Sequence, residues 1–347
     1  MGCKACVKLF HDQEQINFAN QLNQNNLSKQ ELKELLNKFL ESSGYEKIYE
    51  EEFLSNIPDD YINYSNEQPF ILPQELKEKE NLIEMEPIKF KNGNIYKGKW
   101  NSENQMEGQG KYLIKADNVY TEGYWENGEL KYGRIFLPEK NIYEGFINDS
   151  KYNGNGKLIF PDATYEGIFS KGEFKKGKMT WNNGYEYDGE FNGFCLNGKG
   201  KLTGPDNEIY EGNFNNNLFH GKGKYIYKNN EYEYDGEFQY GIKKGKGKYT
   251  AMYDFTYDGN WDNDLPFGNG KYSNWDNSCI LKCTFRAGKI AEEPIFEAGS
   301  KENINVDEFE IKPKEMKLNT KNLTHINFIE DEKTQFVLGS VLSFLNE

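Results

Sequence analysis

The chain has 347 residues, and 42 lysines and arginines against 56 aspartates and glutamates give a formal net charge of −14. A chain this acidic has no long-range attraction for nucleic acids or anionic lipid surfaces, so any such contact must be local. Only 36% of the residues are hydrophobic, yet the chain holds 24 tyrosines, 24 phenylalanines and 34 glycines. Few aliphatic side chains with many rings and glycines indicate a thin β structure with little interior, rather than a disordered chain.

The sequence begins MGCKAC, which lacks the apolar segment of a secretory signal. No run reaches the roughly 18–20 apolar residues that cross a bilayer, so we expect the protein on the cytosolic side of a membrane. The same residues resemble a dual acylation signal, with myristate on Gly2 and palmitate on Cys3 and Cys6. Two acyl chains hold a protein on a membrane stably, whereas one chain binds marginally. The alternative is a Gly-Cys start that carries no lipid.

A helix is predicted over residues 28–42. Ser28 and Glu31 have the spacing of a capping box, in which each side chain accepts a hydrogen bond from the other residue's backbone. Leucines and a phenylalanine then recur along one stripe of the helix, which predicts one buried face. Gly44 has the position and the conformational freedom to end the helix.

Residues 28–54 are similar to an EF-hand, and in particular to the first hand of calcineurin B-like proteins. The loop has Glu46 where an EF-hand needs glycine, so we predict no bound calcium and no other metal. For residues 1–57 we expect an acylated N-terminus and a short helical hairpin that packs against the end of a sheet. Residues 58–89 contain four prolines and are interpreted as a linker, with one short helix over 74–85.

The main feature of the sequence is an internal repeat. A phrase of the form Tyr-x-Gly-x-aromatic or Ile recurs every 22–24 residues, with one extra residue in the second copy. A second phrase, Gly-x-Gly-Lys, follows each tyrosine by about 11 residues in six copies. The eight opening tyrosines are Tyr96, Tyr120, Tyr143, Tyr165, Tyr187, Tyr210, Tyr234 and Tyr257.

The spacing inside the two phrases predicts paired strands. Alternate residues of a strand share a face, so Tyr210, Gly212 and Phe214 point one way, as do Gly221 and Gly223 in the next strand. A glycine beside aromatics leaves a floor on which a large ring can lie. The opposite face carries Glu and Lys, and short polar stretches between the phrases are typical of turns. The predicted fold is mainly β: an elongated single-layer antiparallel sheet of stacked hairpins.

These phrases resemble the MORN repeat (membrane occupation and recognition nexus), over residues 96–280. The resemblance implies a gently curved single-layer sheet with an aromatic groove on one face. Members of the family mostly act as scaffolds, whose groove receives a helix or an extended peptide. We place the repeat sheet at 90–290, including a decayed ninth first strand with the sequence LKCTF at 281–285.

Two segments follow the repeats. Residues 291–325 are polar and acidic and are interpreted as an irregular tether. Residues 326–347 regain an apolar periodicity that predicts an amphipathic helix. That helix could cap the open edge of the last hairpin, lie in the aromatic groove or dock on a partner, and self-association through this end of the chain is a further possibility.

The first functional hypothesis is a non-catalytic scaffold, tethered by lipid, that binds a protein partner in the groove. It places the protein at the cytosolic face of a membrane, the cell cortex, a cilium or another cytoskeletal structure. The alternative for the rings is that they only pack against one another and hold the sheet together. The residues expected to line the groove are Tyr96, Trp100, Tyr120, Trp125, Tyr143, Tyr165, Phe169, Tyr187, Phe191, Tyr210, Phe214, Tyr234, Phe238, Tyr257 and Trp261.

Two other functions are weighed against the scaffold. The lysines of the Gly-x-Gly-Lys phrases could recognise phosphoinositides or an anionic membrane directly, but the Tyr-x-Gly phrases put carboxylates on the same face. An enzyme is not expected, because the sequence has no phosphate-binding loop and no G-x-S-x-G elbow. The three histidines lie far apart in the sequence, so we predict no zinc site, no Cys–His nucleophile and no cofactor.

Overall fold

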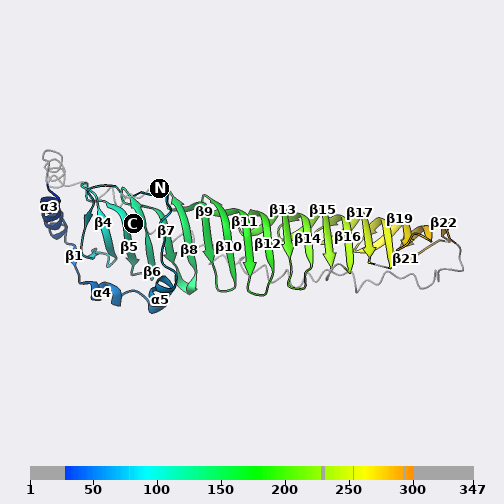
Figure 1. The fold of residues 1–347 in the computed structure, drawn as a ribbon, viewed down its shortest axis with the longest axis horizontal. Helices are drawn as coiled ribbons and strands as arrows, with labels where there is room; N and C mark the ends of the chain where they lie inside the picture. The colour runs from blue at the N-terminus through cyan, green and yellow to red at the C-terminus, as the bar shows by residue number, and fades with distance from the viewer. Residues whose placement is uncertain (1–27, 78, 228–230, 253, 293, 300–347) are drawn as a thin grey trace. The chain divides into compact units, whose positions relative to one another are not determined.

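The computed structural model describes residues 28–299, except 78, 228–230, 253 and 293. The fold is mainly β, with 57% of the described residues in strands that pair antiparallel as open sheet built of hairpins, which confirms the predicted fold class (Figure 1). The described residues divide into two compact units, 28–173 and 174–299, and each is treated by itself below.

The first unit contains the α-helices of the described residues. The predicted helix over 28–42 is confirmed as α3 (Lys29–Ser42), and its capping box is formed. The Ser28 backbone N–H donates to Glu31 Oε2 at 2.8 Å, and Glu31 N–H donates to Ser28 Oγ at 3.4 Å. Gly44 follows the helix with φ +74°, in the left-handed region that favours glycine. Two shorter helices, α4 (Glu50–Ser55) and α5 (Asp59–Glu67), come next.

The helix predicted over 74–85 is wrong. The described residues of that range form turns and the short strand β2, whereas α5 lies earlier, inside the predicted linker. Helix α5 is stabilised by tertiary contact, because Tyr61 stacks on Phe136 at 5.0 Å between ring centroids and its OH donates to Leu137 O at 3.0 Å. Within the range of the predicted helix, Tyr124 OH donates to Lys77 O at 2.8 Å, which holds that backbone against the sheet.

Ten strands belong to the first unit. The short strands β2 and β3 pair with opposite halves of β4, and β1 pairs with β3, so residues 83–89 cover the free edge of β4. From β4 to β10 each strand pairs antiparallel with the next. The strands are β1 (Glu46–Lys47), β2 (Ile83–Glu84), β3 (Ile88–Lys89), β4 (Ile95–Trp100), β5 (Met106–Ile114), β6 (Val119–Glu126), β7 (Glu129–Phe136), β8 (Ile142–Asn148), β9 (Lys151–Ile159) and β10 (Ala163–Ser170), with a 3-10 turn at Pro138–Lys140.

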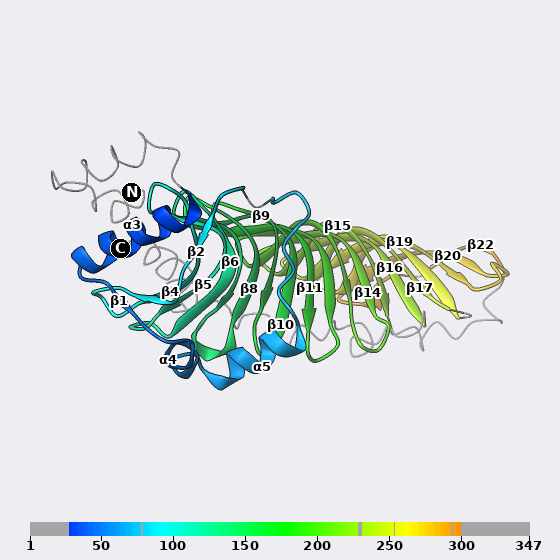
Figure 2. The same ribbon diagram turned by 60° about the vertical axis from the view of Figure 1, so that its left-hand side comes forward.

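Helices α4 and α5 lie against one face of this unit (Figure 2). Phe53, Ile57 and Tyr61 form a buried cluster with side chains of β4 to β8, including Leu113 and Phe136. Fully burying such side chains contributes about 1.5–3 kcal/mol each. The sheet therefore has a second layer here, which the expected single-layer fold does not include.

The second unit is built of twelve strands. Each strand from β11 to β20 pairs antiparallel with the next, and β20 also pairs with β21 and β22. The strands are β11 (Glu173–Trp181), β12 (Glu186–Asn192), β13 (Cys195–Thr203), β14 (Ile209–Asn215), β15 (Leu218–Tyr227), β16 (Tyr232–Gln239), β17 (Ile242–Ala251), β18 (Phe255–Asp262), β19 (Leu265–Asn274), β20 (Ile280–Arg286), β21 (Lys289–Ile290) and β22 (Ile295–Ala298).

The hairpin tips of this unit are bonded to the preceding repeat. Gly241 N–H donates to Phe219 O at 2.8 Å, and Asp264 N–H donates to Lys243 O at 3.2 Å. In the same way Gly288 N–H donates to Pro266 O at 3.1 Å. Because each tip bonds to a fixed position one repeat back, these bonds set the offset between neighbouring hairpins.

The ends of the chain give three outcomes. The predicted ninth strand is confirmed as β20. The interpretation of 291–325 as an irregular tether is wrong at 295–298, where β22 pairs with β20 and covers its edge. The predicted acylation sites Gly2, Cys3 and Cys6, and the helix predicted over 326–347, lie outside the described residues.

Candidate functional site

The candidate site is the face of each unit that carries the opening tyrosines of the repeats. We call it the ring face, and the opposite face the charged face. In the first unit Tyr96, Tyr143 and Tyr165 lie on the ring face; in the second, the four from Tyr187 to Tyr257 do.

Six of the ring-face tyrosines, all but Tyr165, are seen to lie on a pair of facing glycines. Gly212 and Gly223 are opposite each other in β14 and β15, and a Cβ on Gly223 would lie 2.4 Å from Tyr210 Oη. The ring thus occupies the space of the absent side chains. The Tyr210 OH donates to Asn213 O at 2.8 Å. The same bond to the carbonyl three residues on is made by Tyr96, Tyr143, Tyr187, Tyr234 and Tyr257, at 2.8–3.1 Å.

The first glycine of the Gly-x-Gly phrase has a different role from the one predicted. Gly221 has φ +62°, and the pairing of β14 with β15 shifts register at this point. It is needed for a left-handed backbone at a bulge and not as a floor for a ring. The corresponding glycines share this conformation, with φ between +64° and +87°, at Gly108, Gly154, Gly198, Gly245 and Gly268.

The bulge places a second side chain over each tyrosine. Phe219 stacks on Tyr210 with centroids 3.6 Å apart and planes 9° from parallel, and Tyr152 stacks on Tyr143 at 3.7 Å. The aromatic residue that ends each Tyr-x-Gly phrase then meets the tyrosine edge-on, as Phe214 meets Tyr210 at 5.0 Å. Burial raises the pKa of Tyr143 and Tyr210, so these phenols are neutral at physiological pH.

All fifteen residues predicted to line the groove are at most 6% exposed. In both units these rings are therefore the core of the sheet, and a partner can reach only their outer edges. Partly exposed rings lie beside them on the ring face of the second unit, at Trp181, Tyr185, Tyr227, Tyr232 and Phe255.

The expectation that all opening tyrosines share one face is wrong for Tyr120. Gly123 comes three positions after Tyr120, whereas in the other repeats the glycine comes two positions after the tyrosine, so Tyr120 and Gly123 lie on opposite faces. Tyr120 pairs with Leu113 and belongs to the cluster under α4 and α5. On the ring face its place is taken by Thr121, and Leu130 covers Gly123.

The charged face carries the predicted alternation of carboxylates and lysines. In the second unit Lys224 lies opposite Glu211 on one side and Asp235 on the other. Lys248 lies between Asp235 and Asp258 in the same way. Each such exposed pair contributes little, about 0.2–1 kcal/mol, but the alternation cancels charge along the face.

One lysine of this series is replaced by arginine, at the point where α5 covers the first unit. Arg134 is 4% exposed and its Nε and Nη2 both lie 2.7 Å from Glu144 Oε2. Its Nη1 donates to Gln68 O just past α5, and its guanidinium lies 5.4 Å from the centre of the Tyr64 ring. The planar guanidinium serves the carboxylate, the helix end and the ring together, which a lysine ammonium cannot do.

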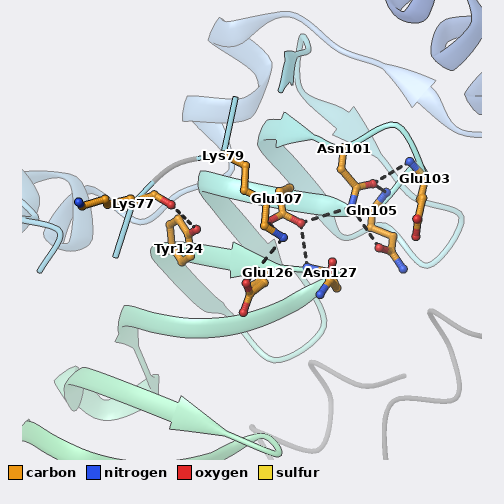
Figure 3. Close-up of polar contacts among 9 residues, drawn as sticks. All are labelled: Lys77, Lys79, Asn101, Glu103, Gln105, Glu107, Tyr124, Glu126 and Asn127. Carbon is orange, nitrogen blue, oxygen red and sulfur yellow. Dashed lines mark hydrogen bonds and ion pairs between the residues drawn. The ribbon is translucent and has the colours of Figure 1, made fainter. Parts of the chain in front are cut away.

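A buried carboxylate fixes the segment after α5 to the sheet (Figure 3). Glu107 in β5 has a fully buried side chain, and Lys79 Nζ lies 2.9 Å from its Oε1. Its Oε2 accepts from Asn127 N–H at 3.0 Å and from Asn101 Nδ2 at 3.3 Å. Together with the bond from Tyr124 OH, this ion pair holds Lys77 and Lys79 against the strands.

In the second unit a lysine takes the place of an apolar residue in the core. Lys243 is two residues before Gly245, where other repeats have Phe219 or Tyr152, and it is 2% exposed. Its Nζ lies 5.2 Å from the centre of the Tyr234 ring, and 5.7 and 5.8 Å from those of Trp261 and Tyr249. Burial lowers the pKa of Lys243 to about 8, although Asp264 acts in the opposite direction.

The described residues show no group of three or more His, Cys, Asp or Glu side chains that could hold a metal ion. Burial raises the pKa of the Cys283 thiol to about 11, so this cysteine is protonated at neutral pH. Among the same residues no helix is both long and apolar enough to cross a membrane.

The comparisons with known proteins identify the repeats. The family model described as the MORN repeat matches residues 96–115, 143–164, 210–232, 234–251 and 257–276. Of the eight predicted repeats, those opening at Tyr120, Tyr165 and Tyr187 are not among the matches. No curated protein matches the chain.

Solved structures with some likeness include TCP domains. The TCP10 domain of Danio rerio CPAP has 11% identity and a TM-score of 0.24, over 58% of this chain and 90% of that one. Its complex with a STIL peptide has 12% identity and a TM-score of 0.23, over 61% of this chain and 93% of that one. The SAS-4 TCP domain of Drosophila melanogaster in complex with a motif of Ana2 has 8% identity and a TM-score of 0.19, over 67% of this chain and 98% of that one. Scores this low do not establish a shared fold, whereas the family matches do show that the chain contains MORN repeats.

We expect Gly223→Ala to destabilise the second unit by about 2 kcal/mol or more, because the new methyl overlaps the Tyr210 hydroxyl and the ring has no free space to enter. The measurement is the urea midpoint followed by circular dichroism. Gly193→Asn is the control, since nothing lies within 4 Å of a Cβ there and Asn tolerates its φ of +61°. Equal midpoints for the two variants would contradict the role given to the glycine pair.

Lys243→Met is expected to stabilise the protein at pH 7 by about 1–3 kcal/mol, after allowance for the lost cation–π contacts. With a folded pKa of about 8 against 10.5, the native protein releases the proton between these values while the unfolded chain keeps it. Wild-type stability therefore rises across that window relative to the variant.

The check is unfolding of both proteins at pH 7, 8, 9 and 10. Lys244→Met removes the same charge from an exposed neighbour. Its free energy of unfolding should therefore change with pH as that of the wild type does. Two results together would refute a buried ammonium: the wild type is more stable than Lys243→Met at pH 7, and its free energy of unfolding does not rise relative to that of the variant at higher pH.

Proposed function

We propose that this protein is a non-catalytic scaffold whose MORN repeats hold a protein partner against the ring face. The observation that carries the proposal is one arrangement that recurs in both units. In it a tyrosine ring lies on a pair of glycines, and its OH donates to the carbonyl three residues on. A surface that repeats at a fixed interval favours a partner segment that runs along it and makes a similar contact at each repeat.

Within this proposal, the residues predicted to line the groove have two roles. Fourteen of them form the buried layer that fixes the surface and offer only their edges to a partner. The partly exposed rings beside them, such as Trp181 and Tyr185 at the turn between β11 and β12, supply most of the contact. Aromatic side chains are the usual carriers of binding energy at interfaces. Tyr120 is left out, because it faces α4 and α5.

Direct binding of phosphoinositides by the repeats is the less favoured candidate. A lysine that binds a phosphate must not already be neutralised, yet Lys201 lies opposite Asp188 and Glu211, and Lys224 opposite Glu211 and Asp235. The formal net charge of −14 acts against an anionic surface as well. We therefore attribute membrane association to acyl chains on Gly2, Cys3 and Cys6, and place the protein at the cytosolic face of a membrane, at the cell cortex or at a cilium.

No catalytic residue or cofactor is part of this proposal. On the ring face, burial raises the pKa of the phenols of Tyr143, Tyr187, Tyr210, Tyr234 and Tyr257, and each donates to a backbone carbonyl, so they are held in their neutral form. On the charged face of the second unit the carboxylates lie opposite lysines and are open to solvent. Neither arrangement tunes an acid and a base toward neutral pH, as general acid–base catalysis needs.

Trp181→Ala combined with Tyr185→Ala should remove the protein partners that the full-length chain captures from cells, because both changes delete partly exposed rings of the ring face. Capture is quantified by mass spectrometry against wild type. The matched control is Tyr240→Ala with Phe267→Ala, which deletes rings that are 59% and 51% exposed away from the ring face. Equal loss in both double variants, or in neither, would exclude this face as the binding surface.

Gly2→Ala should move the full-length protein from the membrane fraction to the soluble fraction of cells, since myristate is attached to the glycine. Incorporation of labelled myristate should disappear with it. Recombinant protein without acyl chains should fail to float with vesicles that contain 30% phosphatidylserine or 5% phosphatidylinositol bisphosphate. Flotation of that protein would instead favour lipid recognition by the repeats.

A further inference from the structure

One end of the hairpins in the second unit carries a continuous row of rings. The turns between β15 and β16, β17 and β18, and β19 and β20 all lie at this end, which we call the aromatic edge. Tyr227 contacts Tyr232 with ring centroids 6.2 Å apart, and Tyr232 stacks on Tyr249 at 5.9 Å. Tyr249 and Phe255 are 5.8 Å apart, and Phe255 stacks on Tyr272 at 5.3 Å. The row thus crosses five neighbouring strands.

Two large apolar side chains project to solvent from the turns at the same edge. Met252 is 50% exposed and Trp275 is 66% exposed. Their backbones are held in place, since Met252 N–H donates to Glu231 O and Trp275 N–H donates to Asp254 O, both at 2.9 Å. In the row, Tyr227, Tyr232 and Phe255 are partly exposed, whereas Tyr249 and Tyr272 are buried beneath them. An exposed tryptophan and an exposed methionine at the same end as partly exposed rings make a surface that fits an apolar segment of protein.

Among the described residues, the charged side chains of the turns at this edge are carboxylates. Each turn presents an exposed carboxylate: Asp206 between β13 and β14, and then Glu231, Asp254 and Asp276 in the three turns that follow. Rings with carboxylates around them favour a segment that combines lysines with apolar side chains, because the ammonium groups meet both the carboxylates and the ring faces.

The chain itself continues from this edge. Strand β22 runs antiparallel to β20, with Ala298 paired to Ile280, and a Cβ on Gly299 would lie 2.9 Å from Ser278 O in the last turn. Residues 300–311 follow, and then the segment 312–325, KPKEMKLNTKNLTH. This segment has four lysines against one glutamate, with Met316, Leu318 and Leu323 among them. It is basic and partly apolar in a chain that is otherwise acidic.

We propose that residues 312–325 dock on the aromatic edge of the second unit of the same chain. Twelve residues, the number in 300–311, span at most about 40 Å when fully extended, and a random coil of that length spans about 20 Å on average. Strands β19 and β15 are about 19 Å apart at 4.8 Å per strand, so the whole row is within reach. A tether this short holds its segment at an effective concentration on the order of millimolar. The docked segment covers part of the ring face, so it competes there with a partner.

The test is trypsin cleavage of the full-length protein after Lys314, Lys317 and Lys321, followed by mass spectrometry. Docking protects these bonds in wild type. The variant Glu231→Gln, Asp254→Asn and Asp276→Asn keeps side-chain shape and should raise the three cleavage rates at least about tenfold, as should 0.5 M NaCl. Trp275→Ala is a second, independent variant with the same expected direction.

The control removes equal charge from the charged face, as Glu211→Gln, Asp235→Asn and Asp258→Asn, and should leave the rates unchanged. Equal rates in wild type and in both edge variants would overturn the proposal, as would a rise in the control of the same size. Carbodiimide cross-linking of mixed 15N-labelled and unlabelled protein identifies the occupant. Cross-links between the tail lysines and the edge carboxylates within one copy support the proposal, whereas mixed-isotope pairs would show a second copy and overturn it.

Discussion

The structure depends on one constraint: where nothing covers a sheet, each hairpin must make its core from its own side chains. A tyrosine ring laid flat on two facing glycines meets this constraint, because the glycines remove two side chains from beneath the ring and the strands stay close. The phenol then satisfies its hydrogen bond within the same hairpin, at the carbonyl three residues on. A lone hairpin is marginal in water, so the edge-on contacts between rings of neighbouring repeats supply the rest.

This arrangement limits what the rings can do for function. A side chain that is at most 6% exposed cannot be the main contact of a partner, however aromatic it is. The tyrosine that makes a repeat recognisable in the sequence is therefore the one most committed to stability. Contact falls to neighbours such as Tyr232 and Phe255, whose rings stand on the same face and keep part of their surface in water. Within a repeat, the residues that stabilise the fold are therefore different from those that can contact a partner.

The sequence predicts the repeat well because its physical cause is local. Tyr-x-Gly and the second glycine of Gly-x-Gly lie in one hairpin, and period-two spacing alone brings them together. The capping box of α3 is local in the same sense, with Ser28 and Glu31 three residues apart. A bulge is harder to foresee, since Gly221 shares its spacing with the floor glycines and differs only in φ. The apolar residue two positions before it, Phe219, was a usable signal that the glycine pattern obscured.

What could not be predicted depends on contacts distant in the chain. Helix α5 is stabilised by the contact of Tyr61 with Phe136, which is 75 residues away in the chain. The sequence of the helix alone does not indicate this contact. The extra residue at Tyr120 is visible in the sequence, but its effect is clear only once the opposite face is known to be covered.

The departures from the repeat follow a common logic. Tyr120 and Arg134 both break the pattern where α5 lies on the sheet, and both contact the added layer or its charges: Tyr120 OH donates to Glu122, which lies 3.9 Å from Arg134 Nη1. A strict repeat would have a lysine in place of Arg134 and would turn the Tyr120 ring to the ring face. The helix would then lack both of these contacts on the sheet. Lys243 breaks the pattern in the opposite sense, by placing a charge where the repeat needs a ring. In a periodic fold the regular residues hold the array together, so the irregular ones are where a segment that does not repeat is recognised.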